Sequence, residues 1–297
     1  MTFYEIEFPL ATLSLDEVEA ALLELGADSI TLVDRGDEPV LEPKPGEVRL
    51  WSDTLVRALF QESSEGDLGR ARNLERLSAR LGREFGAAAR VTAVENQDWE
   101  RVWLADWRSM RFGRRLWVCP TAAELPDDAD AVVVRLDPGL AFGTGTHPTT
   151  ALCLQILDSL PVTARNVIDY GCGSGILGIA ALKLGAAHVT AVDLDPQALL
   201  ATRDNAVRNG VSSRIDVQGI DGGLQAAYCV MANILADPLI ELAPKLTAAC
   251  EPGGYLLLSG LLKTQAYAVK AAYAAAFDKV QVVERDDWCC IYARRGA

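Results

Sequence analysis

The chain has 297 residues, half of them hydrophobic, and its 28 basic and 41 acidic residues give a net charge of −13. This length and hydrophobic content allow two domains with buried cores, while the charge argues against binding nucleic acid by phosphate neutralisation. No apolar run reaches the roughly 18 to 20 residues of a membrane span, and seven scattered cysteines with only two histidines favour reduced thiols in the cytoplasm over disulfides or a zinc site.

Residues 1–95 predict a small α+β domain of the ferredoxin-like type. Strands are expected over 3–8, 29–34, 55–60 and 88–95, and helices over 14–27 and 71–82, which gives the order βαββαβ. Ser14 followed by Glu17 has the spacing of a capping box at the start of the first helix. Residues 1–60 hold 13 acidic residues against four basic ones, a net of −9 that suits either a solvated face or a docking surface for a basic partner.

A linker helix is expected over 96–110, where Trp99, Trp103 and Trp107 recur at helical spacing and would pack one domain on the other. Residues 111–297 predict the second domain. Two short strands, over 115–120 and 131–136, are expected to form a hairpin. From residue 152 helices and strands alternate, which is typical of a parallel sheet covered on both faces.

Three glycines, Gly171, Gly173 and Gly175, follow an apolar strand and fit two nucleotide-binding patterns. Such a turn lets a ligand lie against the backbone, and Asp193, at the end of the next strand, can accept hydrogen bonds from both ribose hydroxyls. This pairing predicts a nucleoside ligand, but by itself it leaves both NAD and S-adenosylmethionine open.

Three further features favour S-adenosylmethionine. Asp169, just before the first glycine, would repel a pyrophosphate but can face a sulfonium or an ammonium. Asn233 ends the fourth strand at the crevice where such sheets bind ligands. The chain closes with two strand-like runs, over 279–284 and 288–293, in the manner of the final antiparallel hairpin of methyltransferases, and leaves no room for the catalytic domain of a dehydrogenase.

A glycine- and threonine-rich loop precedes the helix that starts near Thr149 and Thr150, whose hydroxyls can cap that helix and face a carboxylate. His147 invites a role as general base, but beside Pro148 in a loop it is more simply a structural or lid residue. His188, on a turn, is expected to be inert.

The stretches DPGLAFGTGTHPTT, GCGSGILGIAALKLGA and ANILADPL, in this order behind an acidic βαββαβ domain, closely resemble the PrmA family, which methylates ribosomal protein L-eleven (L11). The resemblance covers essentially the whole chain. It implies a class I, Rossmann-like S-adenosylmethionine-dependent methyltransferase in which Thr150, Gly171, Asp193 and Asn233 contact the cofactor and Phe142 walls the site. It also implies methylation of lysine ε-amines and of the N-terminal α-amine of L11, with recognition by the N-terminal domain.

Asn233 is the expected catalytic residue, and no side chain is assigned as general base. We expect a cytoplasmic monomer that needs neither nucleic acid nor a metal. One alternative is an amino-methyltransferase acting on a nucleobase or a glutamine amide, but such enzymes carry Asn-Pro-Pro-aromatic where this chain has Asn233, Ile234 and Leu235. Another is a non-catalytic ribosome-assembly module that keeps the cofactor fold.

Overall fold

The computed structural model describes residues 3–10, 13–36, 50–61, 79, 82–83, 90–94, 108–137 and 145–296. The chain divides into two compact units, Met1–Trp99 and Glu100–Ala297. The tryptophan stripe and nearly all of the helix expected over 71–82 lie outside the described residues.

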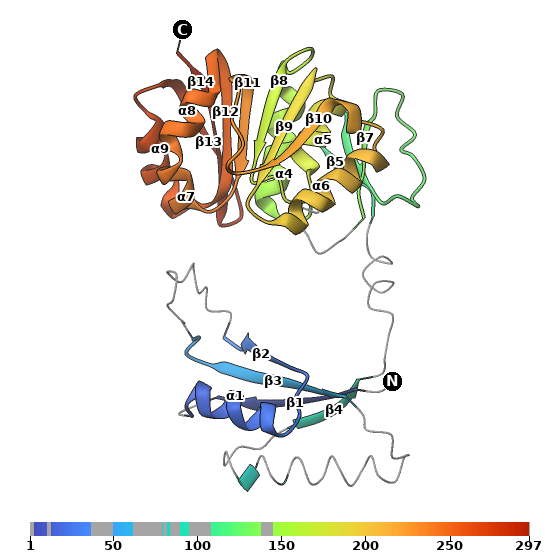
Figure 1. The fold of residues 1–297 in the computed structure, drawn as a ribbon, viewed down its shortest axis with the longest axis vertical. Helices are drawn as coiled ribbons and strands as arrows, with labels where there is room; N and C mark the ends of the chain where they lie inside the picture. Colours follow the sequence, from blue (N-terminus) through green and yellow to red (C-terminus); the bar gives the residue numbers. More distant parts are fainter. Residues whose placement is uncertain are drawn as a thin grey trace. The chain divides into compact units, whose positions relative to one another are not determined.

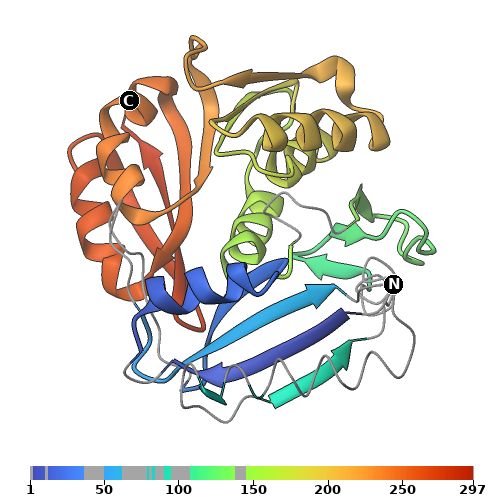
Figure 2. The same cartoon turned by 60° about the horizontal axis from the view of Figure 1, so that its bottom comes forward.

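The first unit is built on a four-stranded antiparallel sheet. Its described elements are β1 (Phe3–Pro9), α1 (Leu15–Glu24), β2 (Ser29–Asp34), β3 (Thr54–Gln61) and β4 (Arg90–Val94). The strands lie in the order β2-β3-β1-β4, as a ferredoxin-like sheet requires, and α1 lies along one face with Val18 and Leu22 in the core (Figure 2). Ser14 is the N-cap residue of α1, but its side chain makes no capping hydrogen bond, so only the position of the expected capping box is correct.

The second unit begins with a small three-stranded sheet of β5 (Met110–Phe112), β6 (Leu116–Cys119) and β7 (Val132–Arg135). The expected hairpin of β6 and β7 is wrong, because these two strands pair in parallel. The antiparallel partner of β6 is β5, which is joined to it by a tight turn at residues 113–115. The connection between β6 and β7, residues 120–131, has the dozen residues that a parallel crossover needs.

The main sheet of the second unit has seven strands in the order β10-β9-β8-β11-β12-β14-β13 (Figure 1). Their bounds are β8 (Asn166–Tyr170), β9 (His188–Asp193), β10 (Ile215–Gly219), β11 (Ala227–Asn233), β12 (Cys250–Leu262), β13 (Phe277–Arg285) and β14 (Trp288–Arg295). The first five strands are parallel, and β14 runs antiparallel to both β12 and β13. The expected Rossmann-like sheet with a final antiparallel hairpin is therefore confirmed.

Helices cover both faces of this sheet. They are α4 (Pro148–Ser159), α5 (Ile176–Lys183), α6 (Pro196–Arg208), α7 (Ala236–Glu241), α8 (Ala243–Ala249) and α9 (Ala266–Tyr273), with short 3-10 turns at Ser212–Arg214 and Lys263–Gln265. Successive strand residues alternate between two cores, so that Val167 packs with α4, α5 and α6 while Ile168 packs with α7, α8 and α9. Burial on both faces explains why these strands read as continuous apolar runs.

All seven cysteines are free and buried. Burial raises the pKa of Cys172 to about 12 and that of Cys289 to about 11, so these thiols stay protonated near neutral pH. The described residues contain no group of acidic, histidine or cysteine side chains placed to hold a metal ion. Nor is any helix among them long and apolar enough to cross a membrane.

Candidate functional site

The candidate site lies at the carboxyl edge of the parallel strands. β8 ends at Tyr170, β9 at Asp193 and β11 at Asn233, and β8 is hydrogen-bonded between the other two strands. The chain moves outward from β8 to β9 and β10, then returns to the other side of β8 with β11 (Figure 1). Open α/β sheets bind ligands at this kind of switch point.

The turn between β8 and α5 holds three glycines in left-handed backbone conformations, with φ of 76° at Gly171, 54° at Gly173 and 78° at Gly175. At Gly171 an added Cβ would overlap Cγ2 of Ile234, and at Gly175 it would lie 2.8 Å from Cγ2 of Thr202. Gly171 and Gly175 are therefore favoured for two reasons: their backbone conformation is left-handed, and there is no space for a side chain.

Two residues of α6 hold this turn and were not anticipated from the sequence. Thr202 donates from Oγ1 to the carbonyl of Gly173 at 3.0 Å, and Asn205 donates from Nδ2 to the carbonyl of Ser174 at 2.8 Å. Both side chains are buried. Two polar residues three apart on the buried face of an amphipathic helix were the available signal.

Asp193 also braces the turn. Its Oδ2 accepts from the backbone N–H of Gly173 at 2.9 Å, and its Oδ1 accepts from that of Asp195 at 3.0 Å. A carboxylate has about four acceptor sites, so both oxygens can still accept from ribose hydroxyls. Asp193 therefore stabilises the glycine turn in addition to its predicted role in binding the ribose.

Asp169 is fully buried one residue before Tyr170. Its Oδ2 accepts from the backbone N–H of Gly178 at 2.8 Å, whereas its Oδ1 has no hydrogen-bond partner among the described residues. Burial raises the pKa of Asp169 to about 7, the Gly178 bond opposes this rise, and the charge of Asp193 adds to it. A cationic ligand would compensate this carboxylate, so the site fits S-adenosylmethionine rather than a pyrophosphate.

On the other side of the glycine turn, Asn233 points its amide toward α4. Nδ2 of Asn233 donates to Oγ1 of Thr150 at 3.2 Å, while its Oδ1 is buried without a partner among the described residues. Thr149 and Thr150 are both fully buried. A buried amide oxygen without a partner is unusual, and a hydrogen bond donated by a ligand would satisfy it.

The expected capping role of Thr149 and Thr150 is wrong, because His147 is the N-cap residue of α4. Its Nδ1 accepts from the backbone N–H of Thr149 at 3.4 Å and lies 2.7 Å from Oγ1 of Thr149. Pro148 takes the first helical position, which suits its fixed φ and lack of an N–H, so the cap lies two residues before Thr149.

His147 also contacts Trp288, which begins β14. Their ring centroids are 4.7 Å apart in an edge-on arrangement, and burial lowers the pKa of His147. The final hairpin thus reaches the start of α4 at the carboxyl edge of the sheet, a contact that could not be predicted from the residue pattern.

The structure brings eight of the nine predicted cofactor residues to this edge, while Phe142 lies outside the described residues. The eight are Thr149, Thr150, Asp169, Gly171, Gly173, Gly175, Asp193 and Asn233. Their arrangement offers a turn with three glycines, a carboxylate beside it and an amide across it.

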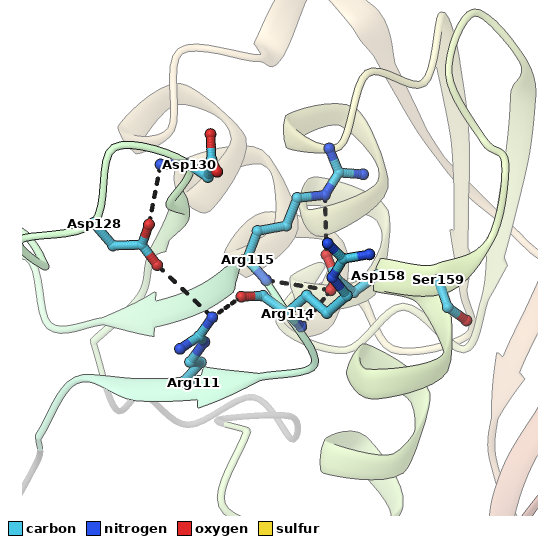
Figure 3. Close-up of a pocket in the computed structure, with 7 residues that line it drawn as sticks. All are labelled: Arg111, Arg114, Arg115, Asp128, Asp130, Asp158 and Ser159. Atoms are coloured by element: carbon cyan, nitrogen blue, oxygen red, sulfur yellow. Dashed lines mark hydrogen bonds and ion pairs between the residues drawn. The ribbon is translucent and has the colours of Figure 1, made fainter.

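A separate cleft lies at the opposite end of α4 and is shown in Figure 3. The nearly buried side chain of Asp158 accepts from the backbone N–H groups of Arg114 and Arg115 and from Nε of Arg115. Arg111 pairs with Asp128 at 3.8 Å. The bonds to Asp158 attach the β5–β6 turn to the end of α4. Most charged groups of this cleft are paired with one another, and the cleft is not part of the candidate site.

Residues 2–296 match the profile of a protein family described as ribosomal protein L11 methyltransferase (PrmA). A ribosomal protein L11 methyltransferase of Escherichia coli is 49% identical in an alignment of 297 positions that covers 99% of this chain and all of that protein. One from Vibrio cholerae is 51% identical over 275 residues, 92% of this chain and 91% of that protein.

A solved structure is also similar. The crystal structure of a ribosomal protein L11 methylase from Lactobacillus delbrueckii subsp. bulgaricus has a TM-score of 0.58 and 31% sequence identity. The match covers 64% of this chain and all of that one.

Proposed function

Because this chain belongs to the PrmA family of ribosomal protein L11 methyltransferases, we propose that it transfers methyl groups from S-adenosylmethionine to lysine ε-amines and to the N-terminal α-amine of L11. The observation that carries the proposal is the buried carboxylate of Asp169 beside the glycine turn, one oxygen of which has no hydrogen-bond partner among the described residues. Such a carboxylate calls for a cationic ligand at this position.

The residues that would hold the cofactor are those gathered at the carboxyl edge. Asp193 would accept from the ribose, Asp169 would face positive charge, and Thr150 with Asn233 would line the opposite side. Phe142 would add a wall, as the family resemblance implies. When bound, S-adenosylmethionine supplies an electrophilic methyl group on a positively charged sulfur.

The residues of this chain then have to present an amine in line with that methyl group. A lysine ε-amine, with an ordinary pKa of about 10.4, must first lose its proton. Asn233 is neutral and cannot take that proton, but its Oδ1, which has no partner among the described residues, can accept a hydrogen bond from the amine and fix its direction. We therefore assign catalysis to positioning by Asn233 and name no general base.

We assign recognition of L11 to the first unit. Its first 60 residues carry a net charge of −9, which suits a basic protein substrate. Nothing in this scheme requires nucleic acid or a second copy of the chain, so we propose a monomer. Because the proposed substrate is a ribosomal protein, we also propose that the protein acts in the cytoplasm.

The decisive experiment is mass spectrometry of purified L11 after incubation with this protein and S-adenosylmethionine. We expect mass increments of whole methyl groups, mapped by fragmentation to lysines and to the N-terminus. Asn233→Ala should lower the rate while the protein still binds cofactor. Cofactor binding without methylated L11 would support the non-catalytic assembly module, and methylated glutamine would support the amide methyltransferase.

The two units provide a second test. A fragment that begins at Gln97 keeps every cofactor residue and should bind S-adenosylmethionine as the full chain does. The same fragment should lose methylation of L11. Methylation at the full rate would show that the first unit does not recognise the substrate.

A further inference from the structure

Ile234 lies between the glycine turn after β8 and the strand β12. It follows Asn233 at the end of β11, and its side chain packs partly buried against the core beneath α7, α8 and α9. It lies between two glycines from other elements, Gly171 of the cofactor turn and Gly260 of β12.

On the first side, the contact is made by the side chain. An added Cβ at Gly171 would overlap Cγ2 of Ile234, whereas Cβ of Ile234 would lie 3.8 Å away. The methyl group on the β-branch is therefore the atom that rests against the glycine turn. The Cδ1 end of the side chain is not among the atoms nearest to Gly171.

On the second side, the contact is made by the backbone. An added Cβ at Gly260 would overlap the carbonyl oxygen of Ile234 and would lie 2.7 Å from its carbonyl carbon and 2.9 Å from its nitrogen. Gly260 has a φ of 88° and lies in an irregularity of β12 between Leu258 and Leu261. This irregularity brings the β12 backbone directly against the residue after Asn233.

We propose that Ile234 is a positioning residue for methyl transfer, and that its Cγ2 methyl is the spacer that sets the distance between the glycine turn and Asn233. The inference rests on the proposed function, because the turn would hold the methyl donor and Asn233 the acceptor amine. Transfer in line is sensitive to this distance, since a misplacement of about 1 Å can cost about a hundredfold in rate.

Three substitutions separate a spacer from a simple apolar contact. Ile234→Val keeps both branches at Cβ, and its kcat on L11 should stay within about twofold of the wild type. Ile234→Leu keeps the volume but has no branch at Cβ, and its kcat should fall about tenfold, as should that of Ile234→Ala. The KM for S-adenosylmethionine should change much less, and melting temperatures will show that each variant is folded.

The kcat values of Ile234→Val and Ile234→Leu distinguish a spacer from a purely structural residue. A purely structural role predicts that leucine, the larger side chain, is tolerated at least as well as valine. A kcat for Ile234→Leu equal to or above that of Ile234→Val would overturn the spacer role.

A second measurement does not depend on activity. Gly171→Ala should lower the stability to urea less in the Ile234→Ala background than in the wild type, because Ile234→Ala removes the overlapping methyl. Gly260→Ala is the matched control: its overlap is with backbone, so the loss should be the same in both backgrounds. Equal losses for Gly171→Ala in the two backgrounds would disprove the contact. Wild-type protein that fails to methylate L11 would instead disprove the proposed function.

Discussion

Asn233 and Thr150 are joined by a hydrogen bond of 3.2 Å from Nδ2 to Oγ1, across 83 residues of sequence. The bond fixes which way the amide of Asn233 points. It leaves Oδ1, the acceptor, buried and without a hydrogen-bond partner among the described residues. Thr150, at the start of α4, therefore determines the orientation of the Asn233 amide at the end of β11.

Removal of the Thr150 hydroxyl should release this amide. Thr150→Val leaves Nδ2 of Asn233 without its partner, which should cost on the order of 1 to 3 kcal/mol of unfolding free energy and lower kcat about tenfold. Denaturant unfolding and steady-state kinetics measure the two effects. Thr150→Ser keeps the hydroxyl and is the control, so a valine variant that behaves like the serine variant would contradict this role.

Asp193 should contribute to cofactor affinity. Asp193→Ala removes both carboxylate oxygens, and the lost charge-assisted hydrogen bonds should weaken S-adenosylmethionine binding by about 1.5 to 3 kcal/mol. Calorimetry measures this directly. Asp221→Ala, at an exposed position, is the control. Unchanged affinity in Asp193→Ala would exclude the ribose contact.

Asp169 should make the stability of the ligand-free protein depend on pH. Its pKa is about 7 in the folded state against an ordinary 3.8, so between these values the folded state holds a proton that the unfolded state has lost. Stability should therefore fall as pH rises from about 4 to about 7, by up to the order of 4 kcal/mol, and stay level above that range.

Asp169→Asn provides the test of this dependence. Its amide oxygen can still accept from Gly178, but it carries no titrating proton. The variant should be more stable than the wild type at pH 8, with the gap closing toward pH 4. Parallel pH profiles of the urea midpoint for the two proteins would show that Asp169 does not titrate in this range.

The acidic first unit should speed the encounter with a basic substrate. Glu17, Glu19 and Glu24 lie on α1, and changing all three to Lys should slow association with L11 at low salt. Raising the salt from about 0.05 M to about 0.5 M should slow the wild type in the same way, because the Debye length shrinks. Stopped-flow rates decide: equal rates and equal salt dependence in both proteins would mean that these acids only solvate the helix.

The main sheet and much of the site could be predicted because parallel strands place their last residues at one edge. Asp193 and Asn233 each end an apolar run, and three closely spaced glycines follow another, so their meeting follows from topology alone. The support from Thr202 and Asn205 could not be predicted, since it depends on how α6 is rotated against the glycine turn.

Two errors in the prediction have local causes. The short apolar runs of β6 and β7 carry no sign of direction, and the 12-residue connection between them, residues 120–131, is long enough for the parallel crossover that the structure shows. The cap of α4 was assigned by side-chain type to the two threonines, whereas Pro148 at the first helical position already pointed to His147.

Because all seven thiols are buried, the folded chain should offer no native cysteine to thiol reagents. A thiol reagent needs an accessible thiolate, so the native protein should react with such reagents only as it opens, and the rate of labelling should report unfolding. A single cysteine introduced on an exposed position of either unit would then be the one site that a dye modifies. Pairs of dyes placed in this way would measure the separation of the two units in solution without removal of any native cysteine.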